Sequence, residues 1–213
     1  METLAYILDR WQIDPTAYKR MPIEIPNAGR TDLAKLFGEL GFKIGAEVGV
    51  ERGIFSEVLC THNYGLKLFC IDYWDSYPEY LHPINDGHLA GTYKQAKDRL
   101  KPHDATLIKK FSMDAVRDFK NESLDFVYID ANHELPYVME DIVYWSDKVR
   151  PGGIVAGHDW IKFKNKKYTC HVIEATKWYT HAAKISPWFL LGTRAKVPGQ
   201  VRDNSRSWFW VKE

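Results

Sequence analysis

Four side chains able to carry acid–base or metal chemistry follow two short apolar segments in the second half of the chain. Asp130 and His133 come after the first of these segments, and His158 and Asp159 come after the second. Apolar runs of this length are typical of buried strands in a parallel sheet. Because the carboxyl ends of parallel strands meet at one edge of such a sheet, we expect the four side chains to converge.

The two carboxylates in this group indicate a divalent metal site. Mg²⁺ commonly takes one or two protein carboxylates and completes its coordination with water or substrate. Histidine is a poor Mg²⁺ ligand, so binding by His158 would favour Mn²⁺ or Fe²⁺. Adjacent strand residues point to opposite faces, and both His158 and Asp159 can bind only if the chain has left the strand there. The candidate ligands are Asp130, His158 and Asp159.

Histidine is also well suited to move a proton near neutral pH, since its ordinary pKa is about 6.5. His133, three residues after Asp130, is the first candidate for a general base, and His158 is the second. A structural alternative stays open for His133, which could instead bind the backbone or Glu134 at the start of a helix. The candidate catalytic residues are Asp130, His133 and His158.

A glycine-containing turn, E-V-G-V-E-R-G, runs from Glu47 to Gly53 between an apolar segment and a helical pattern. Gly49 would let a ligand approach the backbone closely, and the helix start beyond Gly53 offers N–H groups. The turn lacks the middle glycine of the G-x-G-x-x-G fingerprint, which disfavours a nicotinamide-dependent oxidoreductase. Glu47 and Glu51 would repel a pyrophosphate and attract a cationic ligand, although such turns also occur without any ligand.

Asp72 ends the next apolar segment, and Tyr73 and Trp74 follow it. An acid roughly 20 residues beyond a glycine turn, at the carboxyl end of a strand, is where open α/β sheets bind ribose hydroxyls. A helix-capping or solvent-facing aspartate is the structural alternative. The coincidence with the turn favours ribose binding.

Short apolar segments alternate with helical patterns from residue 31 onward. This alternation predicts an α/β fold with a doubly wound, mostly parallel sheet of seven strands and helices on both faces. A polar loop without helical pattern separates the last two strands, so the C-terminal strand is expected to be antiparallel. The expected strands are 44–50, 66–71, 105–109, 124–129, 153–157, 188–191 and 208–211.

Residues 1–30 are expected to form a short helix and an irregular strap that acts as a cap or lid on a domain comprising 31–213. Apolar residues repeat at helical spacing over 4–11, and three prolines then prevent long regular structure. The segment 73–91 is a second candidate lid.

Composition narrows the class of protein further. The chain has 213 residues, a net charge of +1, 45% hydrophobic and 27% charged residues, which indicates a globular domain rather than disorder or bulk electrostatic binding of nucleic acid. Three widely spaced cysteines without a C-x-x-C pair favour a reducing compartment, and we expect a cytoplasmic protein. No apolar run approaches the roughly 18 residues of a membrane span.

Taken together, these motifs resemble those of the class I S-adenosylmethionine-dependent methyltransferases, above all the small O-methyltransferase-like group. The resemblance rests on the glycine turn and on four further segments: C-I-D-Y-W at 70–74, F-S-M-D-A at 111–115, D-F-V-Y-I-D-A-N-H at 125–133 and R-P-G-G-I-V-A-G-H-D-W at 150–160. It implies S-adenosylmethionine as the cofactor. Many relatives carry an aspartate beside the adenine where this chain has Ser112 or Met113.

The resemblance also assigns roles along the cofactor. The methionine end would lie beside Glu47 and Gly49, the ribose at Asp72 and the adenine beside Ser112 and Met113. Trp74 would cover part of the adenosine, and Asp130 would lie where cofactor and acceptor meet. The cofactor-binding residues expected in this way are Glu47, Gly49, Val50, Gly53, Asp72, Tyr73, Trp74, Ser112, Met113 and Asp130.

These features predict an enzyme that moves a methyl group to a hydroxyl of a small molecule or sugar, assisted by Mg²⁺ or Mn²⁺. Trp74, Tyr77, Tyr80 and Trp160 fall beside the expected cleft, where aromatic faces would suit a sugar or an aromatic acceptor. Two alternatives stay open: a metal-independent N- or C-methyltransferase of the same fold, and a non-catalytic module that binds the cofactor. A homo-oligomer is compatible with the sequence, whereas nucleic-acid and membrane partners are not expected.

Overall fold

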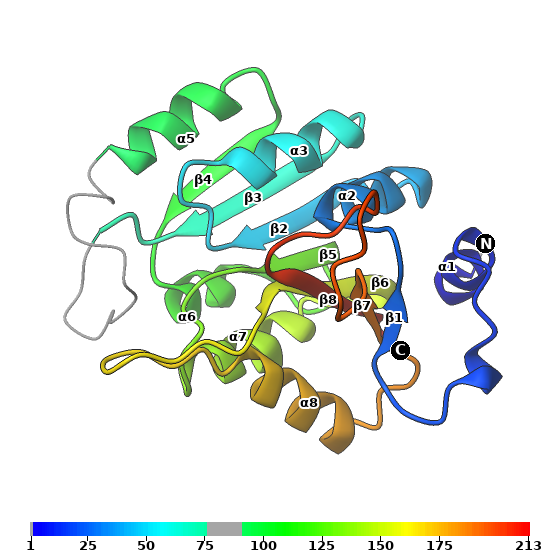
Figure 1. Cartoon of the computed structure of the whole chain (residues 1–213). Coiled ribbons are helices and arrows are strands. Elements are labelled where there is room, and N and C mark those ends of the chain that lie inside the picture. Colours follow the sequence, from blue (N-terminus) through cyan, green and yellow to red (C-terminus); the bar gives the residue numbers. More distant parts are fainter. Residues whose placement is uncertain (1, 76–90) are drawn as a thin grey trace.

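The computed structural model describes residues 2–75 and 91–213 (Figure 1). Within these residues, eight strands form one sheet in the order β1-β7-β8-β6-β5-β2-β3-β4. Neighbouring strands are parallel except around β8, which is antiparallel to both β6 and β7. The predicted fold class is therefore confirmed. The strands are β1 (Ile23–Ile25), β2 (Ile44–Val48), β3 (Lys67–Asp72), β4 (Ala105–Lys109), β5 (Leu124–Ile129), β6 (Val149–Trp160), β7 (Phe189–Leu191) and β8 (Arg206–Val211).

The sheet has one strand more than the seven expected. The additional strand, β1, comes from the segment interpreted as an irregular strap and pairs in parallel with β7. Ile23 and Ile25 are buried in the core, so this part of the N-terminal segment completes the sheet. A three-residue strand between Pro22 and Pro26 is too short to show a period, and only its pairing partner reveals it.

Helices cover both faces of the sheet, as Figure 1 shows, and each face has its own layer of buried apolar side chains. β5 lies in the middle of the sheet and is buried along nearly its whole length, because helices pack on it from both sides. One face carries α2 (Arg30–Glu39), α3 (Ile54–His62) and α5 (Thr92–Leu100), and α1 (Thr3–Arg10) packs its Ile7 into the same layer. The other face carries α6 (Ser112–Ala115), α7 (Tyr137–Ser146) and α8 (Val172–Ala182), and the short 3-10 turns are η1 (Pro15–Ala17) and η2 (Val116–Asp118).

Two differences from the sequence predictions affect the site. β6 extends to Trp160, so His158 and Asp159 lie within its last residues rather than after it. The candidate lid 73–91, together with Tyr77 and Tyr80, lies largely outside the described residues. Among the helices that are described, none has the length and apolar character needed to cross a bilayer. The division of the chain at residue 30 stays a prediction.

Candidate active site at the carboxyl edge of the sheet

A cavity of about 620 Å³ opens at the carboxyl ends of β2, β3, β5 and β6. Its volume is in the range of cavities that enclose small-molecule ligands and cofactors. Two of the residues expected at the site, Gly53 and Trp74, do not line it. The expected residues that line it are Glu47, Gly49, Val50, Asp72, Tyr73, Ser112, Met113, Asp130, His133, His158 and Asp159.

The glycine turn approaches the end of β5 very closely. Gly49 has a φ of 93°, and a Cβ atom built on it would lie 2.1 Å from the carbonyl oxygen of Asp130. No residue with a side chain fits there. Gly53, with a φ of 71°, precedes α3 and packs against Ala96 behind the turn, which explains why it does not reach the cavity.

Asp72 holds the turn in place. Its Oδ2 accepts hydrogen bonds from the backbone N–H groups of Val50 and Glu51, both at 2.8 Å, and its Oδ1 accepts one from Trp74 at 3.0 Å. The indole of Trp74 donates to the carbonyl oxygen of Glu51 at 2.7 Å and is buried. Trp74 therefore supports the turn from behind, and Asp72 couples the end of β3 to the wall of the cavity.

Glu47 is an acid buried at the base of the cavity, with only 2% of its surface exposed. The hydroxyl of Ser56, on α3, donates a hydrogen bond to its carboxyl group. Burial raises the pKa of Glu47 to about 8, although the Ser56 hydrogen bond and the positive charge of Arg30 oppose the shift. A cationic ligand group beside Glu47 would stabilise its ionised form.

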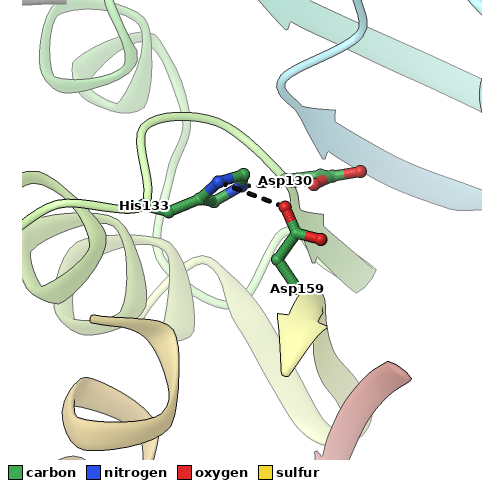
Figure 2. Close-up of side chains that lie close together, drawn as sticks. All are labelled: Asp130, His133 and Asp159. Carbon is green, nitrogen blue, oxygen red and sulfur yellow. Dashed lines mark ion pairs between the residues drawn. The ribbon is translucent and has the colours of Figure 1, made fainter. Parts of the chain in front are cut away.

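Asp130, His133, His158 and Asp159 form an acid–histidine cluster at the ends of β5 and β6. The imidazole of His133 faces both carboxylates (Figure 2), with Nδ1 3.1 Å from Asp159 and Nε2 3.4 Å from Asp130. Nδ1 of His158 lies 3.6 Å from Asp130 and 3.3 Å from Asp159. The four side chains therefore converge, as the sequence predicted.

The backbone at Asp159 explains how two adjacent residues can both face the cluster. Asp159 has a φ of 51°, in the left-handed region, and the pairing of β6 with β8 is irregular between Gly157 and Trp160. The strand alternation is broken at this point, so His158 and Asp159 do not point to opposite faces of the sheet. Because the strand alternation is broken here, His158 and Asp159 can both face one metal ion.

The charges of the cluster depend on one another. Burial would raise the pKa of Asp130, but the neighbouring His158 and His133 outweigh burial and hold it below its usual value. Burial works against the charged form of His158, yet Asp130 and Asp159 raise its pKa to about 10. Both histidines thus act as positive partners for the two carboxylates, a role that a bound cation could also fill.

A divalent cation has suitable ligands here. Ligand atoms of Asp130, His133 and Asp159 all lie within 4.8 Å of one another. This group contains His133 where the sequence predicts His158, although His158 remains within ion-pair distance of both carboxylates. Two hard oxygens and an imidazole nitrogen match the ligands of a Mn²⁺ site, whereas Mg²⁺ would use the two carboxylates.

Arg30 and Asp141 are among the cavity-lining residues that the sequence reasoning missed. The buried Asp141, on α7, accepts a hydrogen bond from Ser112, whose oxygen in turn accepts one from Trp145 at 2.8 Å. Burial raises the pKa of Asp141 to about 7. The signal for Asp141 was its spacing, three residues after Val138 and one before Ile142, which puts an acid on the apolar face of the helix. Arg30 had no such signal, because it is distant in sequence from every motif.

Fold and site together define a small-molecule-binding protein of the doubly wound α/β class, since the cavity lies at the carboxyl edge beside the central strands. A family model described as a methyltransferase domain matches residues 46–160, which is more than half of the chain. The chain therefore belongs to this methyltransferase family, and the class I S-adenosylmethionine-dependent methyltransferases identified from the motifs are confirmed as its class. A search of curated proteins finds no match.

Solved structures share the fold at low sequence identity. A putative caffeoyl-CoA O-methyltransferase from Staphylococcus aureus has a TM-score of 0.61 at 12% identity, over 99% of this chain and 91% of that one. A putative O-methyltransferase from Klebsiella pneumoniae has a TM-score of 0.59 at 15% identity, over 100% and 91% of the two chains. The O-methyltransferase from Bacillus cereus in complex with SAH has a TM-score of 0.56 at 15% identity, over 99% and 87%.

Proposed function

We propose that this methyltransferase moves the methyl group of S-adenosylmethionine to a hydroxyl oxygen of a small molecule or sugar, assisted by Mg²⁺ or Mn²⁺. One observation carries the proposal: the acid–histidine cluster and the glycine turn share a single cavity, and the main chain of Asp130 lies directly against Gly49. The O-methyltransferases that share the fold support an oxygen acceptor. A cytoplasmic location and a homo-oligomer stay predictions.

The residues around the turn fit a sulfonium nucleoside. The turn residues Gly49 and Val50 line the cavity, and the buried acid of Glu47 suits the positive charge of the amino-acid end. When bound, S-adenosylmethionine supplies an activated methyl group with sulfur as the leaving group. We assign Glu47, Gly49 and Val50 to the methionine end, Asp72 to the ribose hydroxyls, and Tyr73, Ser112 and Met113 to the adenine.

The donor set of the cluster fits a divalent ion held by Asp130, His158 and Asp159. Such an ion would lower the pKa of the acceptor hydroxyl and orient it. We assign His133 as the general base: a cation beside the two carboxylates would replace the positive charge of the ring, and the neutral imidazole would accept the hydroxyl proton at Nε2. Asp159 near Nδ1 would stabilise the imidazolium that forms, and the Tyr168 hydroxyl, 3.0 Å from the same nitrogen, would orient the ring.

Two measurements test the proposal. Isothermal titration calorimetry with S-adenosylhomocysteine (SAH) should show binding to the wild-type protein. A screen of sugars and phenols with S-adenosylmethionine, followed by mass spectrometry, should then give a product methylated on oxygen. Asp130→Ala should abolish that product while SAH binding persists.

Each failure has a distinct meaning. A wild-type protein that does not bind SAH would refute the cofactor assignment. Binding without any methylated product would favour the non-catalytic module, and a product methylated on nitrogen or carbon would refute the oxygen acceptor. Turnover undiminished in EDTA would remove the metal ion from the proposal.

A further inference from the structure

Arg30 is a positively charged residue on the wall of the cavity and belongs to none of the sequence motifs. It is the first residue of α2, and its backbone N–H donates to Asp203 at 2.7 Å, which ties the helix start to the loop before β8. Its guanidinium carbon lies 5.1 Å from the ring centre of Phe55. Stacking on an aromatic face fixes the plane of a guanidinium and leaves its N–H donors directed outward.

The guanidinium of Arg30 has no acid partner among residues 2–75 and 91–213. Its side chain makes no hydrogen bond or ion pair there, although it is only partly exposed and lines the cavity. Arg10, Arg150 and Arg206, by contrast, each pair with a carboxylate at 2.7 Å or less. A guanidinium held at a cavity wall without a counter-charge is suited to bind an anionic group of a ligand.

Glu47 faces the same cavity and complements Arg30. The two side chains form no ion pair with each other, although the positive charge of Arg30 is near enough to counteract the burial of Glu47. One region of the wall therefore offers an acid and a guanidinium that do not neutralise each other directly. The α-amino acid end of a ligand carries one ammonium and one carboxylate on a single carbon, which matches this pair of opposite charges.

We infer that Arg30 binds the carboxylate of the amino-acid end of S-adenosylmethionine while Glu47 binds its ammonium group. The inference rests on the proposed function, since it assumes that cofactor. Guanidinium and carboxylate groups form two parallel hydrogen bonds, so Arg30 would fix the direction of the methionine moiety as well as its charge.

The test compares two thioether nucleosides by calorimetry: SAH, which has the amino-acid end, and 5′-methylthioadenosine, which lacks it. Arg30→Gln should lower the affinity for SAH by about 10- to 100-fold and leave the affinity for 5′-methylthioadenosine within about twofold. Arg30→Lys should retain part of the SAH affinity, because it keeps the charge and loses the forked geometry. Arg117→Gln, which removes an exposed arginine outside the cavity, should change neither value.

Two outcomes would overturn the inference about Arg30. SAH affinity unchanged in Arg30→Gln would do so, and an accompanying rise in the KM of an acceptor would assign the guanidinium to an acceptor carboxylate instead. An equal loss of affinity for both nucleosides would assign Arg30 a general structural role. A wild-type protein that fails to bind SAH would instead refute the proposed function, so the two failures are distinguishable.

Discussion

Gly49 and Asp130 are in backbone contact, such that a Cβ atom on Gly49 would lie 2.1 Å from the carbonyl oxygen of Asp130. In addition, the N–H of Asp130 donates to the carbonyl of Val48 at 2.7 Å. The turn assigned to the cofactor and the cluster assigned to the acceptor are therefore held together through the main chain of two neighbouring strands. Small displacements of either part would change the distance between the reacting groups.

Replacing Gly49 tests this contact. Gly49→Ala should lower the free energy of unfolding by about 2 to 4 kcal/mol and abolish SAH binding. The new methyl group would clash with Asp130, and the alanine would have to adopt a left-handed backbone conformation. Urea unfolding and calorimetry measure the two effects. Gly41→Ala is the matched control, since Gly41 also has a left-handed φ of 71° but, among the described residues, no atom within 4 Å of its added Cβ. Equal losses in the two variants would contradict the role of the contact.

Asp72 offers a second test, of the hydrogen bonds that hold the turn. In Asp72→Asn one oxygen becomes an NH₂ group, which would face an N–H donor of Val50 and Glu51 or of Trp74. We expect SAH affinity to fall at least about 10-fold and stability to fall by about 1 to 3 kcal/mol, because a buried donor loses its acceptor. Calorimetry and urea unfolding again report the changes. Asp98→Asn, at an exposed site on α5, should behave like wild type; unchanged SAH affinity in Asp72→Asn would show that Asp72 is not needed for the cofactor site.

Asp141 predicts a pH dependence of stability. Its pKa is about 7 in the folded protein and near 3.8 when unfolded, so the folded state keeps the proton over the interval between these values. The contribution of Asp141 to stability is therefore complete below about pH 4 and is lost as the pH rises through about 7. Asp141→Asn should remove this loss and make the variant more stable than wild type by about 2 to 4 kcal/mol at pH 8, with little difference near pH 4.

Urea unfolding of both proteins between pH 4 and 8 would measure the effect. Glu47 gives a slope of the same sign in both proteins, because its pKa is also raised, and it cancels in the comparison. Parallel stability curves for wild type and Asp141→Asn would show that Asp141 ionises normally in the folded state.

The roles proposed for the two histidines differ in a way that metal binding can separate. Asp159→Asn and His158→Ala should each weaken Mn²⁺ binding by about 10-fold or more, as expected for the loss of a ligand. His133→Asn should leave Mn²⁺ binding within a few-fold and lower turnover by about 100-fold or more, as expected for the loss of a general base. Calorimetry with Mn²⁺ and an SAH-release assay supply the readouts. Loss of Mn²⁺ binding in His133→Asn would place His133 among the ligands instead, a position compatible with its closeness to both carboxylates.

Much of the fold was predictable because its signals are local. The bounds of β4 and β5 agree with the predicted segments, since apolar runs mark them directly. β1 was not predicted, because a strand of three residues is too short to show a hydrophobic period. It is a strand only because it pairs with β7, which is more than 160 residues away in sequence. The extension of β6 to Trp160 likewise depends on its pairing with β8.

The sequence by itself determined which side chains lie at the carboxyl edge of the sheet, because each follows a strand that its own neighbours define. Only the tertiary structure decided how these side chains meet. It turned Asp159 out of the strand alternation, placed the ring nitrogens of His133 near two carboxylates, and brought Arg30 and Asp141 to the cavity from helices that carry no motif. The physical reason is that alternation and helical period are properties of adjacent residues, whereas charge neutralisation and burial depend on residues brought together by folding.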